Sequence, residues 1–392
     1  MKEILLTSES VTEGHPDKIC DQISDAILDA YLTLDSRARV AIEAMVSKNT
    51  IMLAGEITSI ANVDVVEVTR NVVKRIGYVE ENKGFDYKSC LILKNINTQS
   101  PDIDRGVSKT ANSAGEEVIG GGDQGIMYGY AVNETANYMP LPFDLANKLT
   151  MKLTEVRKKG ILPWLYPDGK SQVTMKYKEN GEPLKITSIV VSAQHHESKD
   201  QRSLENEIKS YVINEVIDSQ WTDRETKVHI NPTGRFVVGG PAGDTGLTGR
   251  KIMADTYGTI GKHGGGAFSG KDATKVDRSA AYMARYVAKN VVAAKLADSC
   301  EVSLAYVIGG IQPEAIDINT FGTEKVSTEI IKQIILETFS LSVADIIANL
   351  DLRRPQFEKT ASYGHFGREN EGFRWENLDK VSELREKAFR MI

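Results

Sequence analysis

Residues 16–34 read PDKICDQISDAILDAYLTL, and the rest of the chain is built on the pattern that this stretch sets. Ile19, Ile23 and Ile27 recur at every fourth position, a spacing that places apolar side chains on one face of an α-helix. Pro16 suits the first helical turn, where the N–H group that proline lacks has no partner within the helix. The stretch therefore predicts an amphipathic helix.

Two further stretches, residues 142–158 and 275–296, repeat this helical pattern at similar distances along the chain. Each predicted helix follows a short apolar segment, and each precedes a strand-rich stretch, a second helix and another strand. The apolar segments are 4–7, 126–132 and 251–257; the strand-rich stretches are 39–58, 172–192 and 300–321; the second helices are 63–76, 204–217 and 328–339; the last strands are 89–96, 227–230 and 356–365.

The order β-α-β-β-α-β thus occurs three times. It predicts an α+β fold of three similar βαββαβ-type subdomains, each with helices on one face of its sheet. Glycine-rich stretches near residues 120 and 238 indicate the boundaries, giving an N-terminal repeat over 1–120, a central repeat over 121–238 and a C-terminal repeat over 239–392. The segment 99–122 is polar and lacks an apolar period, so we expect a mobile loop there that closes over a site.

Composition excludes several classes of protein. The 392 residues carry 48 Lys and Arg against 54 Asp and Glu, a net charge of −6, and 41% of them are hydrophobic. These values are typical of a globular protein, and the acidic charge gives no general attraction for nucleic acid or an anionic membrane. No apolar run approaches the ~20 residues of a membrane span, and the N-terminal stretch turns polar too early for a signal peptide. We expect a cytoplasmic protein with neither nucleic-acid nor membrane partners.

Three glycine-rich clusters, at 120–125, 239–249 and 264–270, indicate places where the backbone approaches something closely. Residues 265–271 formally match the phosphate-binding motif G-x-x-x-x-G-K, but Asp272 follows where a P-loop has Ser or Thr, and no strand precedes it. The P-loop fold is therefore excluded. Glycine amides ahead of a helix, with lysines one turn apart, still favour a polyphosphate site. The charged residues in or beside the clusters are Asp123, Asp244, Arg250, Lys251, Lys271 and Lys275.

The sequence HPDK at residues 15–18 lies at the start of the first helix, where the helix dipole favours an anion. Asp17, Asp21, Asp25 and Asp29 then recur at every fourth position, opposite the isoleucines. We interpret the last three as a solvated face. Asp17 differs, because a histidine and a lysine flank it at the helix start, and it is a functional candidate.

The remaining signals narrow the chemistry. His195 and His196 follow a predicted strand and are expected to be exposed. No zinc-ligand spacing and no Gly-x-Ser-x-Gly sequence occurs, so zinc catalysis and an acyl-transfer serine are unsupported. Carboxylate oxygens suit magnesium. The residues alone indicate a magnesium-dependent enzyme that binds a nucleotide polyphosphate, with the metal held by Asp17, Asp123, Asp244 and Asp277.

Five longer motifs carry a family resemblance: TSESVTEGHPDKICD (7–21), GGDQG (121–125), LPWLYPDGKSQ (162–172), NPTGRFVVGGPAGDTGLTGRK (231–251) and HGGGAFSGKDATKVDR (263–278). At these motifs the chain closely resembles the methionine adenosyltransferases, also called S-adenosylmethionine synthases, and the resemblance covers essentially the whole chain. It implies three βαββαβ-type domains around a pseudo-threefold axis, and a homotetramer built as a dimer of dimers whose active sites are shared between chains.

The resemblance also implies a reaction and two cofactors, Mg²⁺ and K⁺. The substrates are ATP and L-methionine: the thioether sulfur attacks C5′ of ATP, and the expelled triphosphate is hydrolysed to diphosphate and phosphate. A neutral sulfur needs no general base, which agrees with the lack of a nucleophile–histidine pair in the sequence. The main contribution to the barrier is the charge of the leaving group, and preorganised cations lower this barrier.

Position by position, the resemblance implies these roles. His15 stabilises the departing triphosphate oxygen, and it shares the catalytic work with Lys170, Arg250, Lys251 and Lys271. The ATP-contacting residues are His15, Asp168, Gly169, Lys170, Arg235, Phe236, Asp244, Arg250, Lys251, Ala267 and Lys271. Those around methionine are Glu56, Gln99, Asp244 and Lys275; Asp17 and Asp277 hold magnesium, Glu43 is associated with potassium, and Cys90 resembles a cysteine near a subunit contact.

Two alternatives stay open on the sequence. The G-x-x-x-x-G-K string favours an ATP-dependent kinase, which would give ADP and a phosphorylated acceptor. The second alternative is a catalytically silent homologue that acts as a regulatory subunit. Against this alternative, every charged position that the resemblance uses carries the expected residue.

Overall fold

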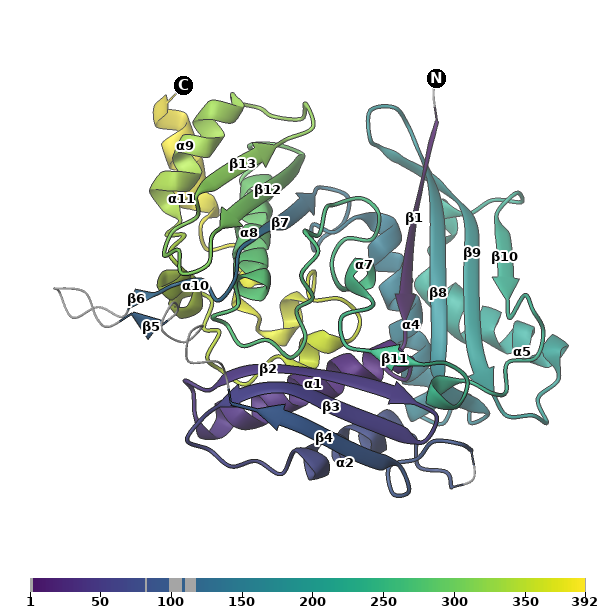
Figure 1. The fold of residues 1–392 in the computed structure, drawn as a ribbon. Helices are drawn as coiled ribbons and strands as arrows, with labels where there is room; N and C mark the ends of the chain where they lie inside the picture. The colour runs from purple at the N-terminus through teal and green to yellow at the C-terminus, as the bar shows by residue number, and fades with distance from the viewer. Residues whose placement is uncertain (1–2, 82, 99–107, 110–117, 392) are drawn as a thin grey trace.

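Three sheets organise the computed structural model, which describes residues 3–81, 83–98, 108–109 and 118–391 (Figure 1). We call them the N-terminal sheet (order β11-β2-β3-β4), the central sheet (β1-β8-β9-β10) and the C-terminal sheet (β13-β12-β7). Two short strands, β5 (Ser108–Lys109) and β6 (Val118–Ile119), pair with each other. The strands are β1 (Ile4–Val11), β2 (Arg39–Ser47), β3 (Thr50–Thr58), β4 (Leu91–Asn97), β7 (Gly125–Val132), β8 (Leu165–Tyr177), β9 (Pro183–His195), β10 (Lys227–Ile230), β11 (Gly246–Leu247), β12 (Ser299–Tyr306) and β13 (Ala315–Asn319).

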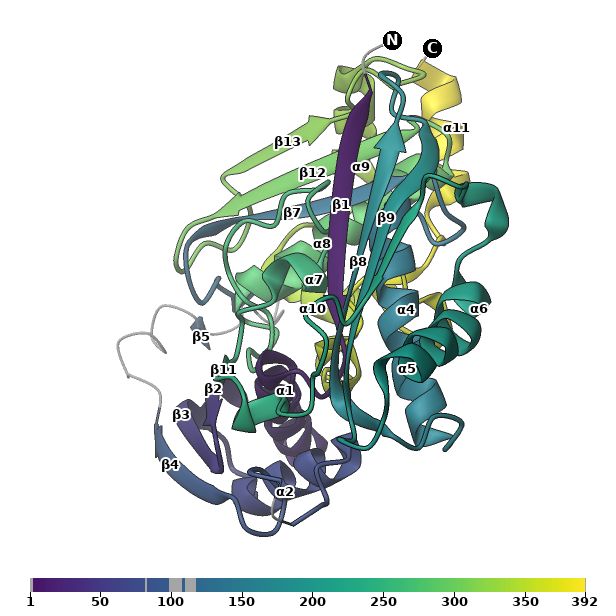
Figure 2. The ribbon, with the colours of Figure 1, turned by 90° about the vertical axis from the view of Figure 1, so that its right-hand side faces the viewer.

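Each sheet is covered by one long helix (Figure 2). Helix α1 packs on β2, α4 packs on β1 and β8, and α8 packs on β7 and β12. These are the three amphipathic helices that the sequence predicts, and the mixed α+β class is confirmed. The helices are α1 (Pro16–Leu34), α2 (Val65–Ile76), α4 (Leu141–Lys158), α5 (Gln201–Ile208), α6 (Asn214–Val216), α7 (Ile252–Asp255), α8 (Val276–Ala293), α9 (Thr328–Thr338), α10 (Val343–Asn349) and α11 (Val381–Met391).

The periodic apolar side chains form the core beneath the sheets. Ile19, Ile23 and Ile27 of α1 are completely buried, and burying each such side chain stabilises the fold by about 1.5–3 kcal/mol. Local signals fix where elements end: Gly181, with a left-handed φ of 83°, closes the hairpin between β8 and β9 that the Asn-Gly sequence predicts. Asp64 caps α2 by accepting the N–H groups of two first-turn residues.

Strands are exchanged between the thirds of the chain. Strand β1 from the first third pairs with β8, β7 from the second pairs with β12, and β11 from the third pairs with β2. Figure 1 shows this exchange by colour, because purple β1 lies beside teal β8 and blue β7 beside green β12. Each third of the chain thus contributes one strand to the sheet of another third, so that each of the three sheets contains strands from two thirds of the chain.

Two predicted strands are wrong. Residues 252–255 form helix α7, and the strand lent by this third is β11, which lies before it. Residues 358–361 form a 3-10 turn within the predicted strand 356–365. The cause lies in α1, because the Asp29 carboxylate accepts the backbone N–H groups of Gln356, Phe357 and Glu358 and gathers them into a turn.

Most of the predicted loop at 99–122 falls outside the described residues, which include only 108–109 and 118–122 of it. Gln99, implied to lie around methionine, falls outside them as well. Within the described part of the chain, no helix is long and apolar enough to span a membrane.

Candidate functional site

The start of α1 is closed by His15. The His15 imidazole is buried, and its Nδ1 accepts the backbone N–H of Asp17 at 3.1 Å, so that the ring serves as the helix N-cap. Burial, reinforced by the nearby Lys251 and Lys170, lowers the pKa of His15 to about 3. The ring is therefore neutral at pH 7, and with Nδ1 accepting, its proton is on Nε2.

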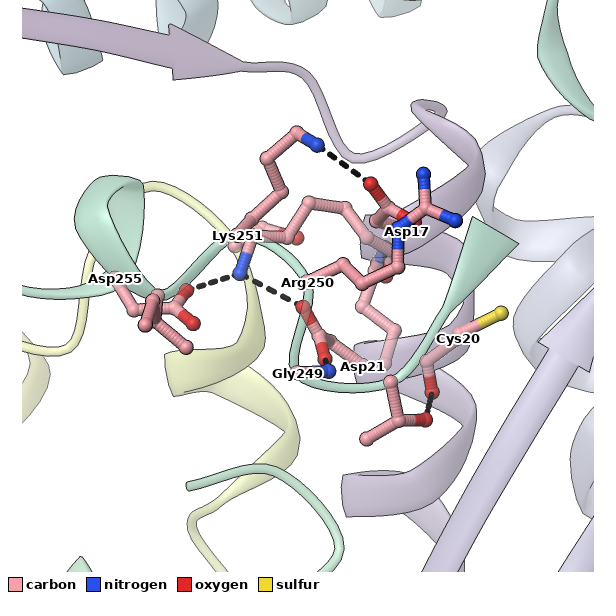
Figure 3. A network of polar contacts seen from close by, with 12 residues as sticks. Asp17, Cys20, Asp21, Gly249, Arg250, Lys251 and Asp255 are labelled. Atoms are coloured by element: carbon pink, nitrogen blue, oxygen red, sulfur yellow. Dashed lines mark hydrogen bonds and ion pairs between the residues drawn. The ribbon is translucent and has the colours of Figure 1, made fainter. Parts of the chain in front are cut away.

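Asp17 gathers cations at the same helix end (Figure 3). Its Oδ2 lies 2.5 Å from Lys251 Nζ, and its Oδ1 lies 3.3 Å from Arg250 Nε and accepts the Leu247 N–H at 3.0 Å. Burial raises the pKa of the Asp17 carboxyl, but the hydrogen bonds from Lys251 and Leu247 outweigh burial and hold this pKa below its ordinary value. Asp17 is thus a buried carboxylate that stays ionised against two cations.

The next turn of α1 carries a second buried charge cluster. Asp21 accepts the Gly249 N–H at 2.8 Å, and Lys18 Nζ lies 3.0 Å from its Oδ2 and also donates to Asp255 of α7. Burial raises the pKa of Asp21 to about 7 and that of Asp255 above its ordinary value. The prediction that Asp21 faces solvent is wrong, because the segment 247–255 packs over this side of α1.

Asp25 and Asp29 also depart from the solvated face that the sequence predicts. Asp25 is fully buried in a two-bond ion pair with Arg278, at 2.6 and 2.9 Å, and accepts the Gly270 N–H at 2.8 Å. Asp29 is partly buried, and it holds the turn at 356–358. Periodicity places both on one side of the helix, but it does not show that other segments cover that side.

The start of α8 carries a cluster of its own. Lys271 Nζ lies 2.6 Å from Asp277 Oδ2, and Lys275 pairs with Asp272. Gly266 lies directly against Asp277, since a Cβ there would be 2.2 Å from its Cγ. The buried His263 Nε2 donates to the Gly266 carbonyl at 2.8 Å and so shapes the glycine run. This arrangement agrees with an anion site at the end of a helix.

The two clusters lie on different sides of the N-terminal sheet. Val40 and Ile42 of β2 point inward, where α1 packs, and Ala41 between them points outward. Ala41 is directly opposite both Lys271 and Glu56, so these side chains share the outward face. Glu43, two residues further along β2, is exposed on that face too. The α1 cluster therefore lies behind the sheet, while Lys271, Glu56 and Glu43 lie in front of it.

Several residues that the resemblance assigns to the ATP site lie near the start of β8 and the end of β9. Asp168 accepts the Gly240 N–H at 2.8 Å, and burial raises the pKa of Asp168 to about 6. His195 holds Phe236 by two hydrogen bonds. The backbone N–H of Phe236 donates to His195 Nε2 at 3.0 Å, and the backbone N–H of His195 donates to the Phe236 carbonyl at 2.9 Å. His195 is thus buried, contrary to the prediction of exposure. The side chains of Lys170, Arg235 and Asp244 are exposed, while Gly169 is buried and Ala267 partly so.

The four aspartates that the residues alone assign to one metal site are not gathered into a set. Asp17 and Asp277 belong to the two separate clusters, and Asp123 and Asp244 are exposed. In the described ranges, no three His, Cys, Asp or Glu side chains come together as metal ligands. Magnesium commonly takes one or two carboxylates and completes its shell with water and phosphate oxygens, and the ionised Asp17 fits that role.

Sequence reasoning missed the residues that hold the clusters in place. Lys18, Asp255, His365 and Arg278 are buried, and they join α1 to α7 and α8. Helical periodicity gives no signal for Arg278, because Arg278 lies on the side of α8 opposite Val276 and Ala280. Cys90 is buried, and Arg70 donates to its carbonyl at 3.1 Å.

Comparison with known proteins gives a match over nearly the whole chain. Three family models match in succession: the S-adenosylmethionine synthetase N-terminal domain over residues 3–101, the central domain over 118–236 and the C-terminal domain over 238–377. S-adenosylmethionine synthase 1 of Rhodospirillum rubrum is 57% identical over 385 residues, which is 98% of this chain and 99% of that protein. The protein of the same name from Rhodopseudomonas palustris is 57% identical over 384 residues, 98% of each chain.

Proposed function

The chain belongs to the S-adenosylmethionine synthase family, and from this premise we propose how it makes S-adenosylmethionine from ATP and L-methionine. The thioether sulfur of methionine attacks C5′ of ATP, the C5′–O bond breaks, and its electron pair leaves with the triphosphate. The triphosphate is then hydrolysed to diphosphate and phosphate. Because a neutral sulfur attacks without losing a proton, the protein needs no general base, and its main task is to stabilise the leaving polyanion.

His15 is the hydrogen-bond donor to the departing oxygen. Its Nδ1 is committed to the Asp17 N–H, so the Nε2–H is the group left to donate. A neutral donor in a buried position is preorganised, and such a donor is worth about 10²–10³ in rate. The burial that holds the ring neutral also excludes the water that would compete for its proton.

Lys170, Arg250, Lys251 and Lys271 neutralise the phosphate groups. In the structure, Lys251 and Arg250 pair with Asp17, and Lys271 pairs with Asp277. Binding therefore exchanges partners: the phosphates take the cations, and the freed carboxylates become available. Asp17 and Asp277 would hold magnesium and Glu43 potassium. When bound, magnesium supplies positive charge to the triphosphate.

The remaining residues recognise the rest of the two substrates. Asp168, Gly169, Arg235, Phe236, Asp244 and Ala267 contact ATP, and Glu56, Gln99, Asp244 and Lys275 surround methionine. The buried pair of hydrogen bonds between His195 and Phe236 supports this role, because it fixes the backbone that presents the Phe236 ring.

Two chains complete each site in this proposal. The front of the N-terminal sheet exposes Met45, Leu91 and Leu93 beside Glu56 and Lys271, so a partner chain that covers this apolar face also meets the charged residues there. We propose a dimer with shared sites, paired into a dimer of dimers. The pseudo-threefold axis, the boundaries near 120 and 238 and a cytoplasmic location remain predictions.

The observation that carries the proposal is 57% identity over 98% of the chain, with the motif residues in place. The test is to incubate the protein with ATP, methionine, magnesium and potassium and to identify the products. The proposal expects S-adenosylmethionine, diphosphate and phosphate, and it expects the His15→Ala variant to form them far more slowly. ADP with a phosphorylated acceptor would indicate a kinase instead, and the absence of any product would indicate a silent homologue.

A further inference from the structure

Two aspartates of α1 hold two similar turns. Asp21 Oδ1 accepts the N–H of Gly249 at 2.8 Å, and Asp25 Oδ1 accepts the N–H of Gly270, also at 2.8 Å. Each glycine directly precedes a proposed phosphate-binding cation, Arg250 after the first and Lys271 after the second. Figure 3 shows Asp21 and Gly249 in contact below Arg250 and Asp17.

The two glycines have the same unusual backbone conformation. Their φ angles are +80° at Gly249 and +81° at Gly270, in the left-handed region that favours glycine. There is also no room for a side chain: a Cβ at Gly249 would lie 2.4 Å from the Ala267 Cβ, and one at Gly270 would lie 1.9 Å from the Ile42 carbonyl oxygen. The direction of each N–H, and of the cation that follows, is therefore fixed by a close fit against neighbouring segments.

Each carboxylate is neutralised by a buried cation from a different source. Lys18 Nζ lies 3.0 Å from Asp21, and Arg278 lies 2.6 Å from Asp25. Both cations are almost completely shielded from solvent. A buried ion pair of this kind is costly to form, and removing one partner leaves the other charge buried and uncompensated.

Strand β2 confirms the spacing that α1 sets. Thr248 donates its N–H to the Ala44 carbonyl at 3.0 Å, and Ile42 donates its N–H to the Gly270 carbonyl at 3.1 Å. Two residues of a strand span about 7 Å. The four residues from Asp21 to Asp25 span about 6 Å of helix axis. The two elements therefore hold the turns at nearly the same separation.

We propose that Asp21 and Asp25 are positioning residues for the proposed reaction: through Gly249, Asp21 fixes the turn that carries Arg250 and Lys251, and through Gly270, Asp25 fixes the turn that carries Lys271. One helix thus holds a cation turn for each of the two shared sites to which its chain contributes. Neither aspartate touches substrate. The inference rests on the proposed function, because it is that proposal which assigns the three cations to the triphosphate. Misplacing such groups by about 1 Å can cost about 10²-fold in rate.

Asp21 is the better residue to change, because Lys18 keeps Asp255 as a partner when Asp21 is lost, whereas Arg278 would lose its carboxylate if Asp25 were lost. Asp21→Leu removes the acceptor and keeps the branched shape of the side chain. Asp21→Asn removes the charge but keeps an oxygen that accepts the Gly249 N–H. Asp29→Leu is the matched control, because Asp29 lies on the same stripe and holds three backbone N–H groups of residues 356–358, away from both cation turns.

Three quantities are measured for each variant: the melting temperature, the affinity for magnesium tripolyphosphate by calorimetry, and KM for MgATP and for methionine. We expect Asp21→Leu to weaken tripolyphosphate binding and to raise KM for MgATP by about 10–100-fold, with KM for methionine changed less than about twofold. Asp21→Asn should recover most of the loss. Asp29→Leu should lower the melting temperature and leave tripolyphosphate binding within about twofold of wild type.

The inference is overturned if Asp21→Leu binds tripolyphosphate as tightly as wild type, or if Asp21→Asn is as weak as Asp21→Leu. It is also overturned if Asp29→Leu weakens binding as much, since the effect would then follow stability alone. Failure of the proposed function is seen separately, as a wild-type protein that forms no S-adenosylmethionine, and calorimetry still reports on the turns in that case.

Discussion

The N-termini of α1 and α8 carry the same pair of charges in different surroundings. At α1, Asp17 faces Lys251 at 2.5 Å, and at α8, Asp277 faces Lys271 at 2.6 Å. The Asp17 side chain is 1% exposed and the Asp277 side chain 19%. His15 caps α1 with a side-chain hydrogen bond, whereas Lys275 begins α8 without such a bond in the described part of the chain.

The difference shows two ways to prepare for one polyanion. The α1 end is closed and fully partnered, so a ligand there must replace existing ion pairs. The α8 end is more open, and Gly266 and Gly125 place backbone without side chains next to its carboxylate. The predictions below test whether the two ends act on the same triphosphate in these different ways.

The largest effect is expected at the open end. Lys271→Ala should lower kcat by about 10²–10³ with the fold intact, because a contact made to the leaving group in the transition state is lost. Lys178→Ala is the control, since it removes a lysine from an exposed ion pair with Glu182 at 2.8 Å, far along the hairpin of the central sheet. If Lys271→Ala kept nearly wild-type turnover, the phosphate role of the α8 end would be wrong.

A smaller effect is expected on the metal requirement. Asp17→Asn replaces a carboxylate by a neutral amide, and the magnesium concentration for half-maximal activity should rise by about 10–100-fold. Asp277→Asn should shift the same titration in the same direction. A shift in just one of the two variants would break the comparison, because the two helix ends would then not hold equivalent ions.

The smallest effect is a pH dependence of stability at the closed end. The pKa of His15 is about 3 in the folded protein against an ordinary value of 6.5. Between these values the unfolded chain binds a proton that the folded site refuses, so the His15 contribution is intact above pH 6.5 and is lost as the pH falls toward 3. His15→Asn keeps a good N-cap and does not titrate.

The difference in free energy of unfolding between wild type and His15→Asn should therefore shrink on acidification, by at most about 1.4 kcal/mol per pH unit. Urea unfolding at pH 7, 6 and 5 measures it. The raised pKa values of Asp21 and Asp29 act in the opposite direction, but they are common to both proteins and cancel in the difference. A difference that stays constant over this range would show that His15 is not buried neutral.

Much of the fold is predictable because it depends on local periodicity. The helices at 16–34, 142–158 and 275–296 have apolar side chains at helical spacing, and that spacing alone specifies them. Strand exchange is not predictable in this way, because alternation identifies a strand but not its partner. Nothing in residues 4–11 indicates pairing with β8 rather than with β2.

The same limit explains the errors in the site. The recurrence of Asp21 and Asp25 places them on one side of α1, but burial depends on the distant segments 247–255 and 268–278 that cover that side. Helix α7 is missed for a similar reason. It is a single turn, too short to show a helical period, and its last residue, Asp255, is held by Lys18 of α1. Motif resemblance assigned the cations, whereas the residues that hold those cations in position became visible only in three dimensions.

The central claim is that the α1 end and the α8 end of different chains meet at one site, and mixed dimers test it most directly. His15→Ala and Lys271→Ala chains, each inactive alone, are co-assembled, and the heterodimer is isolated with two distinct tags. If sites are shared, one of its two sites carries both changes and the other carries neither, so the heterodimer should recover about half of the wild-type rate. If each site is built within one chain, every site carries one lesion, and the heterodimer will be as inactive as its parents.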